Sequence, residues 1–126
     1  MKVLLSIKPQ YAEKIFAGSK RYEFRKTMYK NPKVNTVVVY ATQPIGKVIG
    51  EFSVSDIHRD SPKQLWQKTK DHSGITEAFF NEYFAKRKVG FAIEVGKTRR
   101  YPTPLDLADV LPNGFAPQSF AYLPCA

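Results

Sequence analysis

The sequence lacks most of the features that mark secreted, membrane-spanning or metal-binding proteins. Its one cysteine, Cys125, has no partner for an intrachain disulfide, and this favours a reducing compartment. The apolar run at residues 3–5 is too short for a signal peptide, and no stretch approaches the roughly 20 apolar residues of a membrane-spanning helix. His58 and His72 are isolated from each other and from Cys125, so no metal-ligand spacing is present. We therefore expect a cytoplasmic protein that binds neither a membrane nor a metal ion.

The motifs of the common cofactor-dependent and serine-dependent enzymes are also missing. No Gly-x-x-x-x-Gly-Lys loop is present to hold nucleotide phosphates, and no serine lies in a recognisable nucleophile elbow. The sequence therefore predicts no bound cofactor.

Acidic residues are scarce, and their scarcity is uneven along the chain. The chain has 11 acidic and 20 basic residues and a net charge of +9. Residues 1–33 alone carry nine lysines and arginines against two glutamates, a net charge of +7. A local basic excess of this kind is typical of a face that meets a polyanion such as nucleic acid, although a merely solvated lysine-rich surface explains it equally well.

Hydrophobic periodicity predicts one mixed α+β domain over residues 1–126. Apolar runs or strict alternation predict strands at residues 3–7, 21–25, 36–42, 48–57 and 89–95. Helical spacing and start signals predict helices at residues 9–17, 61–68 and 75–84, the first ending at a left-handed Gly18. Gly50 indicates a bulge or a close backbone approach, and the prolines between residues 102 and 117 predict turns before a short closing strand or helical turn near residues 120–123. Short strands interrupted by two or three helices favour a small, partly open barrel.

The segment at residues 18–25 concentrates the charged side chains that suggest a binding site. Tyr22 and Phe24 alternate with Glu23 and Arg25, so the two charged side chains project from one face of a strand, beside Lys20. We expect Tyr22 and Phe24 in the core and the three charged residues as an exposed set. The planar fork of an arginine suits phosphate or a base edge, and a lysine supplies a compact charge. A Glu23–Arg25 ion pair that only stabilises the strand is the alternative.

The stretch from residue 5 to residue 25 resembles the N-terminal signature of ASCH domains, whose hallmark is Gly-x-Lys-x-x-Glu-x-Arg. The hallmark positions are present as Gly18, Lys20, Glu23 and Arg25. The resemblance implies a PUA-like β-barrel of about five to six strands flanked by two or three helices. It also implies a cleft of the kind in which family members bind RNA or modified bases.

Two functions follow from this resemblance. The first is a module that binds nucleic acid, RNA rather than DNA, or a modified nucleotide within it, with a regulatory role in transcription or translation. The alternative is a small metal-independent hydrolase, similar to the ASCH amidohydrolases that act on N4-acetylcytidine or to ribonucleases, with Lys20 and Glu23 as its catalytic residues. The amidohydrolases carry a threonine where this chain has Glu23. We expect that carboxylate to favour charged Lys20, the wrong state for a base, and we therefore prefer binding over catalysis.

Four residues outside the hallmark are further candidates. Lys8 follows the first strand, and Tyr40 and Thr42 end the third, so all three are predicted to line the same cleft and to contact nucleic acid. A solvated lysine and a core tyrosine are the alternatives for Lys8 and Tyr40. Trp66 is expected to pack its helix, with base stacking as its other possible role.

Overall fold

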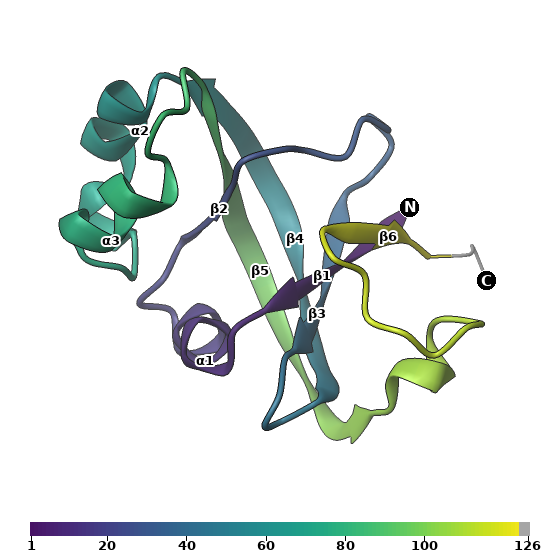
Figure 1. Cartoon of the computed structure of the whole chain (residues 1–126). Helices are drawn as coiled ribbons and strands as arrows, with labels where there is room; N and C mark the ends of the chain where they lie inside the picture. The colour runs from purple at the N-terminus through teal and green to yellow at the C-terminus, as the bar shows by residue number, and fades with distance from the viewer. Residues whose placement is uncertain (124–126) are drawn as a thin grey trace.

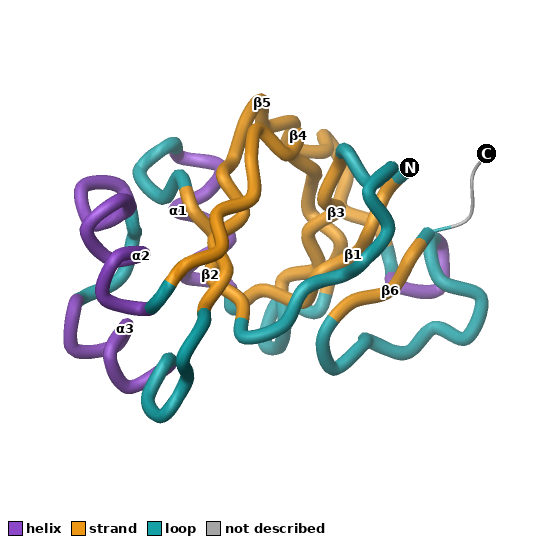
Figure 2. The backbone as a smooth tube through the Cα atoms, turned by 90° about the horizontal axis from the view of Figure 1, so that it is seen from above, coloured by secondary structure: helices purple, strands orange, loops and turns teal. Residues whose placement is uncertain are grey.

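The computed structural model describes residues 1–123, and Cys125 lies outside the described residues. A six-stranded sheet curls into a half-barrel, with helices along one side and the C-terminal segment on the other (Figures 1 and 2). The strands are β1 (Lys2–Ile7), β2 (Tyr22–Arg25), β3 (Thr36–Ala41), β4 (Lys47–Asp60), β5 (Gly90–Leu105) and β6 (Phe120–Tyr122). The α-helices are α1 (Pro9–Ala17), α2 (Pro62–Thr69) and α3 (Glu77–Tyr83), and short 3₁₀ turns occur at Lys70–His72 and Leu107–Asp109. The predicted mixed α+β barrel is confirmed.

The strand order is β2-β5-β4-β3-β1-β6, and β1 and β3 form the parallel pair among the described strands. Both strands are buried on two faces. Val3 and Leu5 face the hydrophobic cluster inside the half-barrel, and Leu4 faces a second cluster beneath the segment that follows β5. Burial on both faces explains why these two strands read as continuous apolar runs and not as alternating ones.

The two longest strands extend beyond their predicted ends. The strand predicted at residues 48–57 runs to Asp60, and the one predicted at residues 89–95 runs to Leu105. The prediction of turns at Pro102 and Pro104 was wrong, because both lie within β5. β2 pairs with β5 only from Phe91 to Glu94, so the later part of β5 has β4 on one side and no strand among residues 1–123 on the other. A proline, which has no N–H to donate, is tolerated along such an edge.

Gly50 lies beside an irregularity in β4, as its position in the sequence suggested. The pairing with β3 steps from Val39–Gly50 to Tyr40–Val48 and leaves Ile49 without a partner. A Cβ atom on Gly50 would lie 2.6 Å from the Arg99 carbonyl oxygen and from the Phe16 ring. Both the predicted bulge and the predicted close approach are therefore confirmed.

Local sequence signals determine where the helices begin and end. α1 begins at Pro9 and ends at Gly18, whose φ of 90° is the predicted left-handed cap. The side chains of Ser61 and Thr76 accept hydrogen bonds from backbone N–H groups in the first turns of α2 and α3. None of the described helices has the length and apolarity needed to span a membrane.

α2 and α3 dock on the face of β2 and β5 through a third hydrophobic cluster. The cluster contains Phe24, Leu65 and Phe80 among its buried members. The Trp66 ring lies 4.9 Å from the Phe80 ring, centroid to centroid, so Trp66 packs its helix as expected. This docking places α3 beside the end of β1 and the start of α1, where it forms one wall of a pocket.

Candidate functional site

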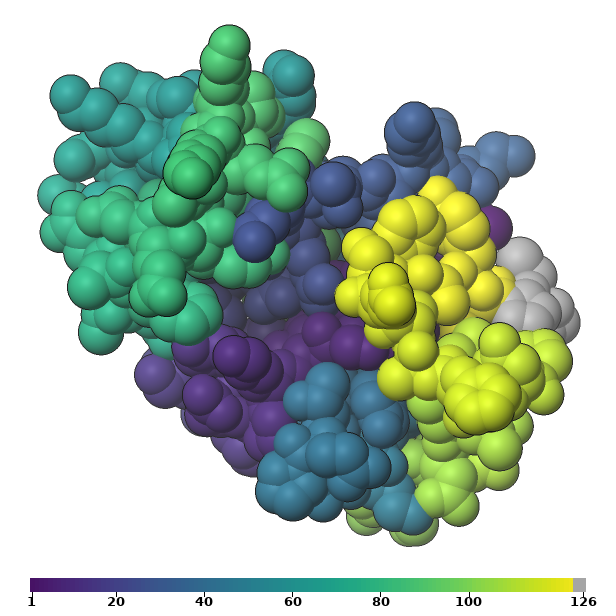
Figure 3. Space-filling model, in the orientation of Figure 1, coloured from purple at the N-terminus to yellow at the C-terminus, as the bar shows by residue number. Residues whose placement is uncertain are grey.

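A pocket of about 190 Å³ lies between the end of β1, the first turn of α1, β2 and α3. In Figure 3 the molecule is hollowed between the green lobe of α2 and α3 and the yellow C-terminal segment, with N-terminal elements deep in the hollow. Lys8, Lys20, Glu23 and Arg25 all line the pocket. The structure therefore brings together the three charged hallmark residues and Lys8, as the sequence suggested.

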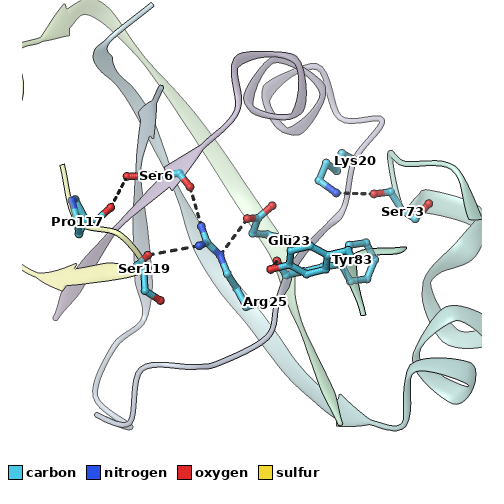
Figure 4. A network of polar contacts seen from close by, with 9 residues as sticks. Ser6, Lys20, Glu23, Arg25, Ser73, Tyr83, Pro117 and Ser119 are labelled. Atoms are coloured by element: carbon cyan, nitrogen blue, oxygen red, sulfur yellow. Dashed lines mark hydrogen bonds and ion pairs between the residues drawn. The ribbon is translucent and has the colours of Figure 1, made fainter. Parts of the chain in front are cut away.

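Lys20 is buried, which corrects the expectation of an exposed side chain. It is only 2% exposed, and its Nζ atom donates a hydrogen bond to the Ser73 carbonyl oxygen at 2.7 Å (Figure 4). The same atom lies 4.8 Å from the centre of the Phe24 ring and 5.4 Å from that of Tyr11. Two aromatic faces and one carbonyl thus replace the water that normally surrounds a lysine.

Gly74 explains how the Lys20 side chain is held in place. Its φ is +70°, and a Cβ atom there would lie 2.5 Å from both Cβ and Cγ of Lys20. Only a residue without a side chain fits this backbone conformation and this proximity comfortably. The Lys20 backbone N–H also donates a hydrogen bond to the Lys14 carbonyl oxygen at 3.1 Å. This bond fixes the backbone from which the Lys20 side chain extends.

Burial lowers the pKa of Lys20 to about 8, from an ordinary value of 10.5. Loss of solvation is the largest cause; the Glu23 charge opposes it, and the Lys14 charge adds to it. Glu23 favours the charged form of Lys20, as expected, but desolvation outweighs this attraction and the net pKa falls. At pH 7 the Lys20 amine is therefore mainly charged, and a minority is in the neutral form that a general base requires.

The Glu23 carboxylate is turned toward Arg25. It is also buried, at 8% exposed, and its Oε2 atom lies 3.2 Å from Arg25 Nε. The approach is too poorly aligned for a hydrogen bond, so it is an ion pair without one. This is the ion pair foreseen as an alternative to a binding role, but it lies at the pocket wall and not on an exposed strand.

Arg25 connects three parts of the chain. Its Nη2 atom donates to the Ser6 carbonyl oxygen at 2.9 Å, and its Nη1 atom reaches the Ser119 carbonyl oxygen at 3.5 Å (Figure 4). The Ser6 hydroxyl in turn donates to the Pro117 carbonyl oxygen at 3.2 Å. Through these two bonds Arg25 ties β1 and the C-terminal segment to the wall of the pocket.

α3 supplies an aromatic wall that sequence reasoning missed. Phe79 and Tyr83 line the pocket, with ring centres 6.4 Å apart and planes inclined by only 10°. The Tyr83 hydroxyl donates to the Phe24 carbonyl oxygen at 3.3 Å, and burial raises the pKa of Tyr83. Of the aromatic residues on α3 and directly after it, Phe80 and Phe84 are the fully buried ones. Aromatic residues at three positions of the seven-residue α3, and a fourth at Phe84 directly after it, form a stripe too wide for one buried face, and that width was the available signal.

Tyr40 and Thr42 do not reach the pocket, contrary to expectation. Tyr40 is 7% exposed and packs in the second hydrophobic cluster with Leu4 and Val38, on the opposite face of the sheet. Thr42 follows β3 and its backbone N–H donates to the Ile7 carbonyl oxygen. The alternation of side chains along β3 decides the direction of Tyr40.

Within residues 1–123 no cluster of three His, Cys, Asp or Glu side chains is placed to hold a metal ion.

The family model of the ASCH domain matches residues 5–99, which include every lining residue of the pocket. This chain belongs to the ASCH domain family. A relative named ASCH domain-containing ribonuclease, from Zymomonas mobilis, is 27% identical over 123 residues, covering 95% of this chain and 82% of that protein. The crystal structure of ASCH from Zymomonas mobilis matches with a TM-score of 0.90 at 24% identity, covering 98% of this chain and 87% of the other, and shows a shared fold.

Longer proteins also contain a similar stretch. A Ureaplasma parvum protein named large ribosomal subunit protein uL22 is 30% identical over 123 residues, and another named ATP synthase subunit alpha is 35% identical over 122. The chain spans 39% and 15% of their respective lengths. The ASCH domain therefore resembles a part of these proteins.

Proposed function

We propose that this ASCH domain binds single-stranded RNA and takes one nucleotide into the pocket around Lys20. The observation that carries the proposal is the aromatic wall of Phe79 and Tyr83, which shares the pocket with a buried lysine amine. Its volume of about 190 Å³ is below the roughly 300–1,000 Å³ of pockets for drug-sized ligands, which suits a single base or nucleoside. Aromatic side chains stack any base, and only an unpaired strand offers its bases freely.

The charges at the pocket support an anionic ligand. Lys8, Lys20 and Arg25 contribute positive charge, and the Glu23 carboxylate, which is paired with Arg25, is the acidic side chain among the lining residues. A polyanion gains affinity from each cation it contacts through counterion release. RNA is favoured over DNA because one relative is named a ribonuclease and another a ribosomal protein.

Hydrolysis of RNA is the second candidate function, and the pKa of Lys20 favours it. Neutral Lys20 can accept the proton of a ribose 2′-hydroxyl as that oxygen attacks the adjacent phosphorus. The new P–O2′ bond forms as the P–O5′ bond breaks, which leaves a 2′,3′-cyclic phosphate. The departing 5′-oxygen takes a proton from water, and the hydroxide so formed takes back the proton held by Lys20. The ribonuclease name of the Zymomonas relative supports this possibility. The amidohydrolase alternative has less support, because Glu23 stands at the threonine position and faces Arg25.

Binding and turnover measured on the same samples test these proposals. The wild type and the variant Lys20→Met are titrated into fluorescein-labelled single-stranded RNA and DNA of one sequence, at 50 and 200 mM salt, by fluorescence anisotropy. The same proteins are incubated with the RNA and with N4-acetylcytidine, and the products are identified by mass spectrometry. The exposed Lys63, replaced by methionine, is the control for loss of one charge.

The outcomes separate the candidates. Salt-sensitive RNA binding without products supports a binding module, and RNA cleavage that Lys20→Met abolishes while binding persists supports a ribonuclease. Release of acetate from N4-acetylcytidine would establish the amidohydrolase activity. If the wild type binds no RNA at 50 mM salt and turns over neither substrate, the proposed function is wrong.

A further inference from the structure

We infer that the pocket accepts an internal nucleotide of a strand, and that Lys8 and Lys26 hold the phosphates on its two sides. This inference rests on the proposed function and adds a substrate class to it: a polynucleotide and not a free nucleoside. It comes from the arrangement of two lysines around Phe79 and Tyr83, which we call the aromatic panel. Lys26 was not among the residues that the sequence singled out.

Each lysine approaches a different ring of the aromatic panel. Lys8 Nζ lies 5.8 Å from the centre of the Phe79 ring, and Lys26 Nζ lies 4.8 Å from that of the Tyr83 ring. The two rings are nearly parallel and 6.4 Å apart. Each ring of the panel therefore has one ammonium group close to it.

The lysines come from different elements, so their positions are set by the fold. Lys8 lies between β1 and α1, and Lys26 directly follows β2. The α1 helix uses only the backbone of Lys8, whose carbonyl oxygen accepts hydrogen bonds from the amides of Tyr11 and Ala12. The side chain of Lys8 is thus free of any part in the helix start.

Within residues 1–123, neither the Lys8 nor the Lys26 amine forms an ion pair with a carboxylate. Lys2, Lys47 and Lys68 form ion pairs with Glu51, Asp106 and Asp60, respectively, but no ion pair or side-chain hydrogen bond involves Lys8 or Lys26 in the described part of the chain. Both lysines are exposed. The nearest acidic group of the pocket, Glu23, is paired with Arg25. Two unpaired, exposed ammonium groups beside an aromatic platform provide what an anionic backbone needs on both sides of a stacked base.

A free nucleoside would contact the aromatic panel and Lys20 but would leave both outer lysines without an anion. A nucleotide with phosphates on its 3′ and 5′ oxygens would engage both. For a single strand the logarithm of affinity falls by about 0.7 per phosphate contact for each tenfold rise in salt. Each lysine is therefore expected to contribute about fivefold to affinity at 0.1 M salt, relative to 1 M.

The test compares ligands that differ only in their phosphates. Uridine, its 3′- and 5′-monophosphates and its 3′,5′-bisphosphate are titrated into the wild type, Lys8→Ala and Lys26→Ala, together with the corresponding adenosine set. Amide chemical shifts monitor binding. In the wild type the bisphosphate should bind more tightly than either monophosphate, and the nucleoside should bind most weakly. One variant should lose the gain from the 3′-phosphate and the other the gain from the 5′-phosphate, with a smaller change in nucleoside affinity.

A labelled single-stranded RNA provides the second readout, and matched charge variants provide the control. The double variant of Lys8 and Lys26 should bind it about 25-fold more weakly at 0.1 M salt, with a salt slope smaller by about 1.4. The double variant Lys63→Ala with Lys97→Ala removes the same charge from exposed positions on α2 and β5 and should bind nearly as the wild type does. Thermal melts verify that all variants are folded.

Two failures are distinguishable. If RNA binds but the Lys8 and Lys26 variants match the Lys63 and Lys97 control, or if the bisphosphate binds no more tightly than the nucleoside, this inference is wrong and the proposed function stands. If neither nucleotides nor RNA bind the wild type, the proposed function falls and this inference falls with it.

Discussion

Replacing Lys20 by methionine should stabilise the folded chain while removing the amine at the centre of the pocket. Holding a lysine charged at a site where its pKa is about 8 instead of 10.5 costs about 3 kcal/mol at pH 7, because each pKa unit corresponds to about 1.4 kcal/mol. Methionine has a similar length and no charge to desolvate. Loss of the hydrogen bond to the Ser73 carbonyl oxygen reduces this stabilisation by about 1 kcal/mol. We expect the free energy of unfolding to rise by about 2 kcal/mol at pH 7.

The pH dependence of this difference is the sharper part of the prediction. The folded pKa of Lys20 is below the unfolded one, so between about pH 8 and pH 10.5 the unfolded chain binds more protons than the folded chain. The stability of the wild type therefore rises through that window relative to the variant. The advantage of methionine is full below about pH 8 and should shrink by about 1 kcal/mol between pH 7 and pH 9. Tyrosines with raised pKa values titrate in both chains and cancel in the difference.

Urea unfolding at pH 7, 8 and 9, followed by the fluorescence of the single tryptophan, Trp66, measures both quantities. The exposed Lys63, replaced by methionine, should change stability by less than about 0.5 kcal/mol at every pH. A Lys20→Met difference that stays constant from pH 7 to pH 9 would refute the reasoning, because it would mean that the amine titrates as an ordinary lysine.

Two further substitutions probe the surroundings of the pocket and the opposite face of the sheet. Gly74→Ala should destabilise the chain by about 2 kcal/mol more than Gly114→Ala, since both have positive φ but only Gly74 meets the Lys20 stem at 2.5 Å; equal urea midpoints would contradict this. Tyr101→Phe removes the hydrogen bond from the Tyr101 hydroxyl to Glu51 at 2.8 Å and should lower the free energy of unfolding by about 1 kcal/mol, whereas an unchanged value would show that water replaces the hydroxyl.

Local signals in the sequence were sufficient for most helices and strands. α1 starts at Pro9, which lacks an N–H, and ends before Gly18, which tolerates a positive φ. Both effects act within a single helical turn. Continuous apolar residues predicted β1 and β3 because burial on two faces requires them. The long extension of β5 was missed, since whether a proline is tolerated in a strand depends on which neighbour pairs with it.

The hallmark residues were found from sequence because their spacing along one short segment defines them, and a strand of alternating residues turns Glu23 and Arg25 to one side. Their chemistry came from elsewhere in the chain. Ser73, which binds the Lys20 amine, is 53 residues away, and Ser119, which binds Arg25, is 94 residues away. The lowered pKa of Lys20 and the inward turn of Phe79 and Tyr83 depend on packing between distant elements, because desolvation is set by whatever surrounds a group in space. The sequence by itself determined the hallmark residues of the site, because they lie together in one short segment; the tertiary structure decided which of them are buried or paired and which distant side chains join them, because those properties depend on packing.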